Sequence, residues 1–276
     1  MTQRPIDPGE RSGVLHPRNL RRYAARWIAP DPAVGAVVDH YWAVEWDLGE
    51  DRVPQRIVAA PAVTLTLERG SVPAPFVLTG VYGTAWERTI EGRGRVFGMR
   101  LRPAGLAVLS DLPVDAAADA TLAVTAGLDP RLHAFMASLP SEAAPDEQAA
   151  AADEAVRSVL ADRPVDAVGL LANAAVAQLI EHGPLPGPEL ASRLGASERT
   201  VQRALRSTLG HGPSWVGRWL RLQDVVRRLS SPGADAAAVA AELGYADQPH
   251  LVRDFSRAVG MTPGAYLRSL LRPTGT

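Results

Sequence analysis

The stretch from Ser197 to Arg206, SERTVQRALR, gathers side chains that can hydrogen-bond to nucleic-acid bases. On a helix, residues three, four and seven positions apart share one face. That face would carry Arg199, Gln202, Arg203 and Arg206. An arginine can donate two hydrogen bonds to guanine O6 and N7, and a glutamine can pair in the same way with adenine. The pattern therefore favours a helix that reads DNA.

A second segment, ELGYADQPHLVRDFSR at residues 242–257, repeats this arrangement 50 residues later. Ser197 and Asp247 are suited to cap the start of a helix, because their side-chain oxygens can accept an unpaired backbone N–H. Gly210 and Gly260 are suited to end it in the left-handed conformation. Each copy thus predicts a helix, a short turn and a second helix. A single such face could be an ordinary solvated surface, but two copies in one register favour a binding function.

A long helix over residues 213–231 is predicted to join the two copies. Its apolar residues recur at helical spacing. They are Trp215, Trp219, Leu222, Val226 and Leu229. Because the tryptophans share this apolar stripe, they are expected to pack in the core rather than stack on bases.

Charge is distributed unevenly along the chain. The net charge is −1, but the 29 basic residues, all arginine, outnumber the acids only after residue 182. This asymmetry predicts that the last third of the chain meets a polyanion.

The elements that must support these helices are read from the rest of the sequence. YWAVEWDL and RVFGMRLRP alternate with a period of two, as strands do. Stretches 131–139, 146–162 and 165–181 have helical apolar spacing. We expect an α+β chain whose N-terminal antiparallel, barrel-like β-rich domain, with its helices, precedes an all-α domain of two helix-turn-helix units joined by a long helix. The predicted ranges are 1–181 (β-rich to about 102, helical over 103–181), a linker at 182–188 and a DNA-binding domain at 189–276.

The order of these features, with LGYADQPHLVRDFSRAVGMTPGAYLR, closely resembles the DNA-binding domain of AraC-type transcription regulators over residues 186–272. The resemblance implies two recognition helices in successive major-groove segments, roughly 34 Å apart. It implies double-stranded DNA and RNA polymerase as partners. The residues matching the base-reading positions are Arg199, Gln202, Arg203, Gln248, Pro249, His250 and Arg253. Since Pro249 and Val252 depart from the usual polar residues, we expect the second unit to read fewer bases.

Phosphate contacts would position the protein without specifying sequence. The candidates for these contacts are Arg206, Ser207, Arg218, Ser256 and Arg257.

The family's N-terminal domains often sense a ligand, and a small barrel can hold one small molecule. Candidate pocket residues are Trp42, Trp46, Tyr82, Trp86, Phe97 and Arg100. Alternatively these aromatics are ordinary core, and Arg100 pairs with an acid such as Glu45. Helices 146–162 and 165–181 are the expected surface of a homodimer, unless they merely cover the barrel.

Several function classes are disfavoured by composition. The chain has no cysteine, which excludes thiolate metal ligands and the acceptor that alkyl-transfer repair fusions need. The histidine spacing gives no zinc pattern, so we expect no metal, no cofactor and no catalytic residue. The polar N-terminus and the absence of a long apolar run predict a cytoplasmic protein rather than a secreted or membrane protein. The resemblance to AraC-type regulators implies that it is bacterial. A ligand-independent regulator whose N-terminal domain binds another protein remains the alternative.

Overall fold

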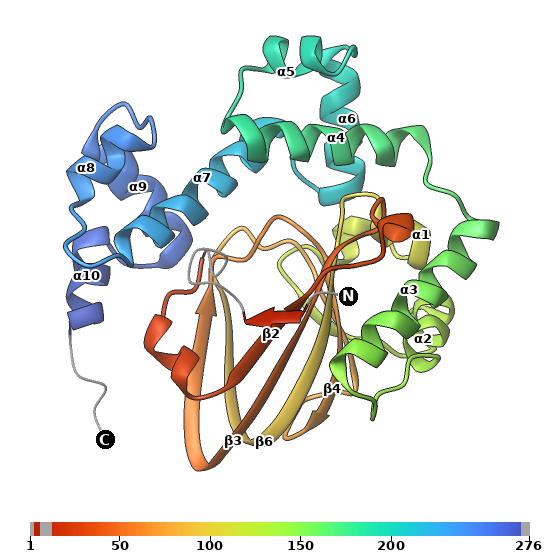
Figure 1. The fold of residues 1–276 in the computed structure, drawn as a ribbon. Coiled ribbons are helices and arrows are strands. Elements are labelled where there is room, and N and C mark those ends of the chain that lie inside the picture. Colours follow the sequence, from red (N-terminus) through yellow and green to blue (C-terminus); the bar gives the residue numbers. More distant parts are fainter. Residues whose placement is uncertain (1–2, 6–12, 272–276) are drawn as a thin grey trace.

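A computed structural model of the chain describes residues 3–5 and 13–271; the remaining positions, including most of the polar N-terminal stretch and the end of the predicted DNA-binding domain, lie outside the described residues. The described part is α+β, as predicted (Figure 1). A curved antiparallel sheet occupies the N-terminal region, and helices extend from it to the C-terminus.

The sheet has seven strands in the order β1-β2-β3-β6-β4-β5-β7. The strands are β1 (Gln3–Pro5), β2 (Ala24–Ile28), β3 (Val38–Ile57), β4 (Thr64–Gly70), β5 (Phe76–Thr79), β6 (Trp86–Leu101) and β7 (Thr121–Ala123). Short 3-10 turns lie at Pro17–Arg21, Pro32–Val34 and Val114–Ala117. The strand pairs of the described residues are all antiparallel, which agrees with the alternating runs in the sequence.

The long strands β3 and β6 form a ribbon whose register shifts between Asp47 and Arg52. The ribbon curves enough that Arg88, near the start of β6, reaches Glu68 on β4 with an Nη1–Oε1 distance of 2.8 Å. This curvature creates a concave face, with the opposite face covered by helices (Figure 1).

The period of two in YWAVEWDL places its residues on these two faces. Trp46 packs with Val53, Ile90 and Val96 in one cluster, while Tyr41 lies in the other, larger core. Trp42 and Trp46 lie flat against glycines of β6. A Cβ on Gly98 would come within 2.1 Å of Trp42, and one on Gly94 within 2.4 Å of Trp46. Glycine is therefore required there so that the indoles can cover the strand.

Four helices follow strand β6: α1 (Gly105–Leu109), α2 (Pro130–Ala137), α3 (Pro145–Asp162) and α4 (Ala167–His182). The bounds of α2, α3 and α4 agree closely with the three predicted helical stretches, whereas the short α1 was not among them. The hydroxyl of Tyr41 on β3 donates to Asp153 on α3 at 2.8 Å, which fixes α3 to the sheet. Burial raises the pKa of the Asp153 carboxyl, although the Tyr41 hydroxyl and the Asp31 N–H both donate to it and oppose that shift.

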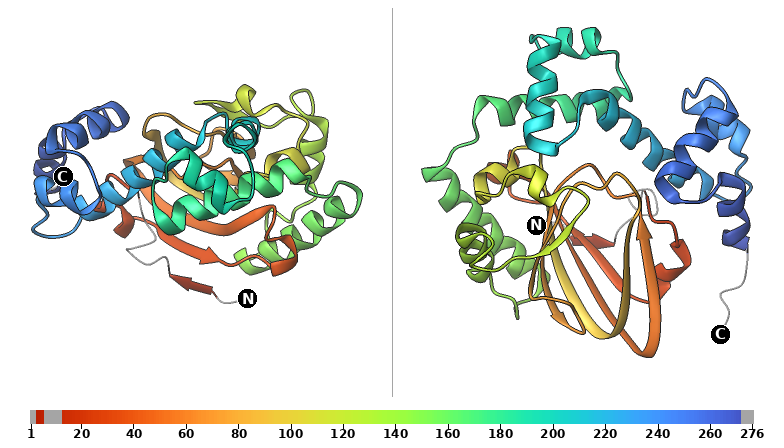
Figure 2. Two further views of the ribbon diagram at one scale, coloured as in Figure 1. Left: turned by 90° about the horizontal axis from the view of Figure 1, so that it is seen from above. Right: turned by 180° about the vertical axis from the view of Figure 1, so that it is seen from behind.

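The last third contains α5 (Gly187–Arg193), α6 (Glu198–Leu209), α7 (Pro213–Leu229), α8 (Ala236–Glu242), α9 (Gln248–Val259) and α10 (Pro263–Leu271). Helices α5 and α6 form one helix-turn-helix unit, and α8 and α9 form another. Figure 2 shows from behind that α7 spans between the two units above the open end of the sheet. The predicted order of helix, turn, helix, long helix, helix, turn, helix is present.

Each helix-turn-helix unit belongs to a different hydrophobic core. The core of the sheet continues through α4 into the first unit, where it includes Leu190, Leu205 and Val216. The second unit has its own core, centred on Leu251 and Phe255, and this core also contains Leu15, Val58 and Ala85 from the N-terminal region. Both units are therefore packed against the N-terminal region in this conformation.

Candidate nucleic-acid interface

Helix α6 begins and ends as its sequence predicts. The Ser197 hydroxyl accepts the Thr200 N–H at 3.2 Å, and Gly210 closes the helix with φ of 75°. Helix α9 is built in the same way. The Asp247 carboxylate accepts the His250 N–H at 2.6 Å, and Gly260 closes the helix with φ of 74°. The left-handed φ explains why glycine stands at both ends.

The two faces of α6 differ sharply in burial. Val201, Ala204, Leu205, Thr208 and Leu209 are buried against α4, α5 and α7. The opposite face is exposed to solvent, and it carries Arg199, Gln202, Arg203 and Arg206. Among the described residues, these three arginines have no carboxylate partner within salt-bridge distance, so their guanidinium groups are available for an outside acceptor.

The exposed face of α9 is less regular than that of α6. Gln248, Pro249, Arg253 and Arg257 are exposed. His250 is only partly exposed, because its ring lies edge-on to the buried ring of Tyr245 at 5.2 Å. Pro249 occupies the first turn, where a missing N–H costs no hydrogen bond. The second face thus offers fewer long polar side chains than the first, as the sequence predicted.

The phosphate candidates are placed in three different ways. Arg206 and Arg257 are exposed on their helices. The Ser207 hydroxyl donates to the Ala204 carbonyl at 3.0 Å, leaving its oxygen free to accept. The Ser256 hydroxyl, by contrast, is buried without a hydrogen-bond partner, so in this conformation it is not presented to a phosphate. This burial argues against the expected phosphate contact of Ser256 in this conformation.

Arg218 has a structural partner that the sequence did not predict. Its Nη1 lies 3.2 Å from Oδ1 of Asp254, whose side chain is 7% exposed. The other carboxylate oxygen accepts from the Tyr245 hydroxyl at 3.4 Å, and burial raises the pKa of that tyrosine to about 12. This cluster joins α7 to α9. The repeat in the sequence contained a sign of this pair. Asp254 aligns with Ala204, on the apolar face of the first copy, and a carboxylate at such a position needs a cationic or hydrogen-bonding partner.

The start of α7 carries a stack of three rings. His211 lies 3.6 Å from Trp215 between ring centroids, and Trp215 lies 5.1 Å from Trp219. Trp219 is buried and donates its indole N–H to the Ala59 carbonyl at 2.7 Å. Burial lowers the pKa of His211. The tryptophans are thus part of the packing, as expected, and Trp219 also contacts the N-terminal region.

Hydrogen bonds from the N-terminal region hold the second unit in place. Arg56 donates to the Val259 carbonyl at 2.8 Å, and the Ala85 N–H donates to the Ala258 carbonyl at 2.7 Å. On α7, Gln223 donates to the Val58 carbonyl at 3.0 Å. The last turn of α9 therefore contacts the sheet region directly, and the exposed face of that helix is held in a set orientation.

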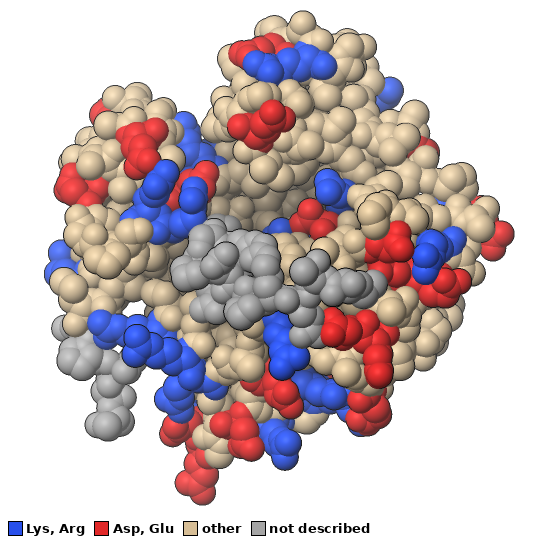
Figure 3. Space-filling model, in the orientation of Figure 1, with Lys and Arg blue, Asp and Glu red and all other residues tan. Residues whose placement is uncertain are grey.

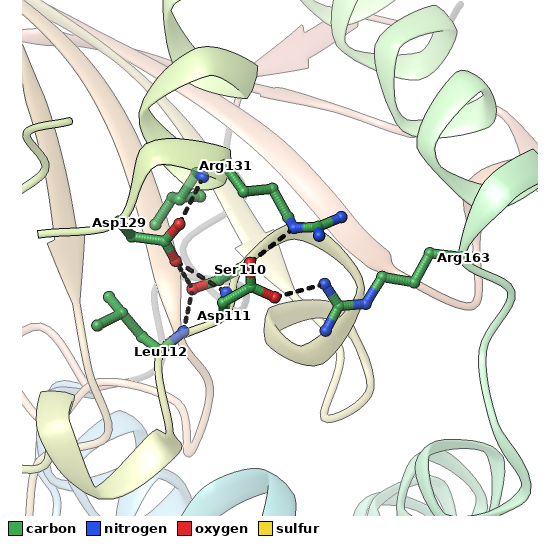
Figure 4. A network of polar contacts seen from close by, with 7 residues as sticks. Ser110, Asp111, Leu112, Asp129, Arg131 and Arg163 are labelled. Carbon is green, nitrogen blue, oxygen red and sulfur yellow. Dashed lines mark hydrogen bonds and ion pairs between the residues drawn. The ribbon is translucent and has the colours of Figure 1, made fainter.

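The C-terminal end of α6 lies beside a polar network at the junction of α1 and α2 (Figure 4). Asp129 accepts from the Ser110 hydroxyl at 2.6 Å, and Asp111 accepts from Arg131 and Arg163 at 2.9 and 2.7 Å. Hydrogen bonds from Arg163 and then Arg131 lower the pKa of Asp111. Ser110, Asp111 and Arg163 line a cavity of about 270 Å³ together with Ser207 and Thr208. This network gives the first unit a rigid neighbour.

The six predicted pocket residues are not brought together. Trp42 and Trp46 share the concave face, whereas Phe97 packs beside Tyr41 in the core on the other side. Tyr82 and Trp86 are at the surface, and both hydrogen-bond to Thr121. Arg100 pairs with Asp39 through contacts of 2.7 and 2.9 Å, rather than with Glu45. Packing accounts for the positions of Trp42, Trp46 and Phe97, and the hydrogen bonds to Thr121 account for those of Tyr82 and Trp86.

No group of metal-binding side chains occurs among the described residues. No helix in the described part of the chain has the length and hydrophobicity needed to cross a bilayer.

Comparison with known proteins bears on both regions. Residues 190–269 match the family described as "Helix-turn-helix domain", and residues 26–123 match a "Domain of unknown function (DUF6597)". The helix-turn-helix match agrees with the architecture described above. The second family carries no described activity.

The curated relatives match over the last third only. The chain is similar to a "Putative AraC-like transcription regulator" of Streptomyces antibioticus, at 37% identity over 79 residues, or 28% of this chain and 26% of the relative. A protein of the same description from Streptomyces lividans is 31% identical over 86 residues, covering 31% of this chain and 28% of the relative. The chain thus covers about a quarter of the length of these relatives.

Solved structures show only a slight likeness. ToxT from Vibrio cholerae aligns over 93% of this chain and 100% of its own, with 10% identity and a TM-score of 0.42. An AraC-type DNA-binding domain-containing regulator from Chromobacterium violaceum aligns over 36% of this chain and 91% of its own, with 22% identity and a TM-score of 0.34. These values are too low to assign a ligand or a mechanism.

Proposed function

We propose that this chain, which carries a helix-turn-helix domain similar to that of AraC-like transcription regulators, is a sequence-specific DNA-binding regulator of transcription. The observation that supports it best is α6, whose solvent-exposed face presents a glutamine and three arginines that have no carboxylate partner among the described residues. Arg199, Gln202 and Arg203 would contact bases in the first half of the site. Double-stranded DNA and RNA polymerase are the partners in this proposal.

The second unit would do more positioning than reading. Gln248 and Arg253 are its exposed candidates for base contacts, with partly exposed His250 beside them. Arg206, Ser207 and Arg257 would contact phosphates. Arg218 would support the interface by holding α9 against α7, because its guanidinium is paired with Asp254.

The N-terminal region would regulate DNA binding by setting the positions of the two units. It contacts α7 and α9 through the hydrogen bonds from Arg56, Ala85, Trp219 and Gln223. A small molecule that binds more tightly to one arrangement of these contacts than to another would change the affinity for DNA.

Alternatively, the N-terminal region would bind a protein partner or a second copy of this chain, and the surface of α4 supports this reading. This helix has no charged residue between Asp166 and Glu181, and its Leu170 and Ile180 are 51% and 66% exposed. Figure 3 shows a largely uncharged expanse on the side where α4 lies. A homodimer formed there would double the phosphate contacts and steepen the dependence of DNA affinity on salt.

Capture of genomic DNA fragments with the full chain tests the proposal. We expect one enriched motif with two parts about one helical turn apart. A variant in which Arg199, Gln202 and Arg203 are all alanine should lose the motif while retaining its melting temperature, because these side chains are exposed to solvent. The matched control is Arg193→Ala on α5, whose arginine is paired with Glu189. Equal enrichment by the triple variant and the control would overturn the proposal.

A further inference from the structure

A large cavity lies between the N-terminal region and the DNA-binding units. Its volume is about 670 Å³. The walls are the loop 60–62, the end of β6, the second half of α4, the middle of α7 and the turn after α8. The surface is hollowed below α4 and α7 and above the end of the sheet (Figure 3). Cavities of this size hold small metabolites.

Arg102, at the sheet end of the cavity, lacks a strong acidic partner. Its Nη2 is 3.7 Å from Asp39, and its Nε is buried without a hydrogen bond. Asp39 is already engaged, because it accepts from Arg100 at 2.7 and 2.9 Å and from His40 at 2.8 Å. The contacts with His40 and Arg100 outweigh burial and hold the pKa of Asp39 far below its usual range. The single negative charge of Asp39 is thus shared among Arg100, His40 and the more distant Arg102.

Arg221, on α7, also lines this cavity. Its Nη1 donates to the Gly244 carbonyl at 3.3 Å, and its guanidinium lies over the Tyr245 ring at 4.1 Å. Its Nε is buried without a hydrogen bond, and no carboxylate of the described chain lies within salt-bridge distance. Two other acids of the cavity wall are paired with arginines, Asp224 with Arg227 and Glu242 with Arg228, while Glu181 lies 3.8 Å from the His182 ring.

The remaining wall is mixed, with polar groups from Asn173, Glu181, His182 and Gln223 beside an apolar part. Val176 and Leu179 from α4, Leu220 from α7 and Leu243 after α8 contribute hydrocarbon surface. A ligand that suits all of these groups has a compact carbon skeleton with an anionic group at each end. A single arginine would suit a monoanion, whereas two arginines from different elements of the wall suit two carboxylates, since each guanidinium matches a carboxylate with paired donors.

We propose that this cavity binds a small dicarboxylate between Arg102 of the N-terminal region and Arg221 of α7. The bound molecule would join the sheet to the helix that separates the two DNA-binding units. Its regulatory effect, a change in DNA affinity on binding, rests on the proposed function; its binding does not. Any such effect is reciprocal, so DNA would change the affinity for the dicarboxylate by the same factor.

Isothermal titration and thermal melting of the full chain test the proposal, with succinate and phthalate as probes and phthalamide as the uncharged control. We expect at least one dicarboxylate to bind and raise the melting temperature, and phthalamide to do neither. Arg102→Gln and Arg221→Gln should each weaken binding by about tenfold or more, because each loses charge-assisted hydrogen bonds. Arg193→Gln, on α5 outside the cavity, should bind as the wild type does.

The result that would overturn the site is failure of both dicarboxylates to bind, or binding that is unchanged in Arg102→Gln and Arg221→Gln. Melting temperatures without probe show whether those variants are folded, and a charge-retaining Arg221→Lys variant that recovers part of the affinity separates charge from structure. DNA affinity of the probe-free chain is measured in parallel. Loss of probe binding with intact DNA binding rejects only the site, whereas intact probe binding without DNA binding rejects only the proposed function.

Discussion

The pair formed by Arg218 and Asp254 predicts an asymmetric response to mutation. Asp254 is 7% exposed and Arg218 is 33% exposed, so the carboxylate depends on its partner far more than the guanidinium does. Replacing Arg218 by alanine leaves a buried carboxylate that keeps the 3.4 Å hydrogen bond from Tyr245 but has no cationic partner among the described residues. Replacing Asp254 by alanine leaves an arginine that can turn to water.

From these exposures, we expect Arg218→Ala to lower the free energy of unfolding by about 2–3 kcal/mol, below the range for a fully buried pair because Arg218 is partly solvated. Asp254→Ala should cost about 1 kcal/mol. The double variant should be closer to Asp254→Ala than to the sum of the two, since the unpaired charge is then gone.

Urea denaturation, followed by tryptophan fluorescence, measures these differences, because Trp215 and Trp219 lie on the same helix as Arg218. The reasoning is refuted if Asp254→Ala is the more destabilising of the two single variants, or if the double variant shows the sum of their losses. DNA binding separates the roles further. If Arg218 also contacts a phosphate, its alanine variant lowers the salt slope by about 1, and Asp254→Ala does not.

Two further predictions concern the sheet. Tyr41→Phe removes the 2.8 Å hydrogen bond to Asp153 and should lower the free energy of unfolding by about 1–3 kcal/mol. Burial already raises the pKa of Asp153 above its ordinary 3.8, so ionisation of this carboxyl opposes folding as the pH rises above that value. The loss of stability in Tyr41→Phe should therefore be greater at pH 7 than below pH 4. A constant loss across a pH series of denaturation curves would contradict this. Gly98→Ala places a Cβ 2.1 Å from Trp42, and should cost about 1–3 kcal/mol; a melting temperature equal to that of the wild type would show that the indole is not held there.

The helix-turn-helix units could be predicted closely because their signals are local. The caps Ser197 and Asp247, the closing residues Gly210 and Gly260, and the apolar spacing of α7 each act within a few residues of the position they determine. The strands of the concave sheet were also visible, since alternation is a local pattern.

What the sequence did not reveal depends on contacts between distant segments. The partner of Arg100 is Asp39, which only the pairing of β3 with β6 brings near. Phe97 and Trp42 lie on opposite faces because adjacent strands set the register, and this separated the predicted pocket residues. The cavity beside Arg102 and Arg221 is formed where the N-terminal region meets α7, and no local pattern marks such a meeting point.

The central claim is that α6 reads bases, and Arg203→Ala tests it most directly. Fluorescence anisotropy would compare this variant with the wild type and with Arg193→Ala on the captured site and on a set of sites with each base pair changed in turn. We predict a loss of about 1–3 kcal/mol in binding free energy for Arg203→Ala on the captured site, with discrimination relaxed at one base pair only, and no change for Arg193→Ala. Unchanged affinity and unchanged base preference in Arg203→Ala would contradict the assignment of α6 as the reading helix.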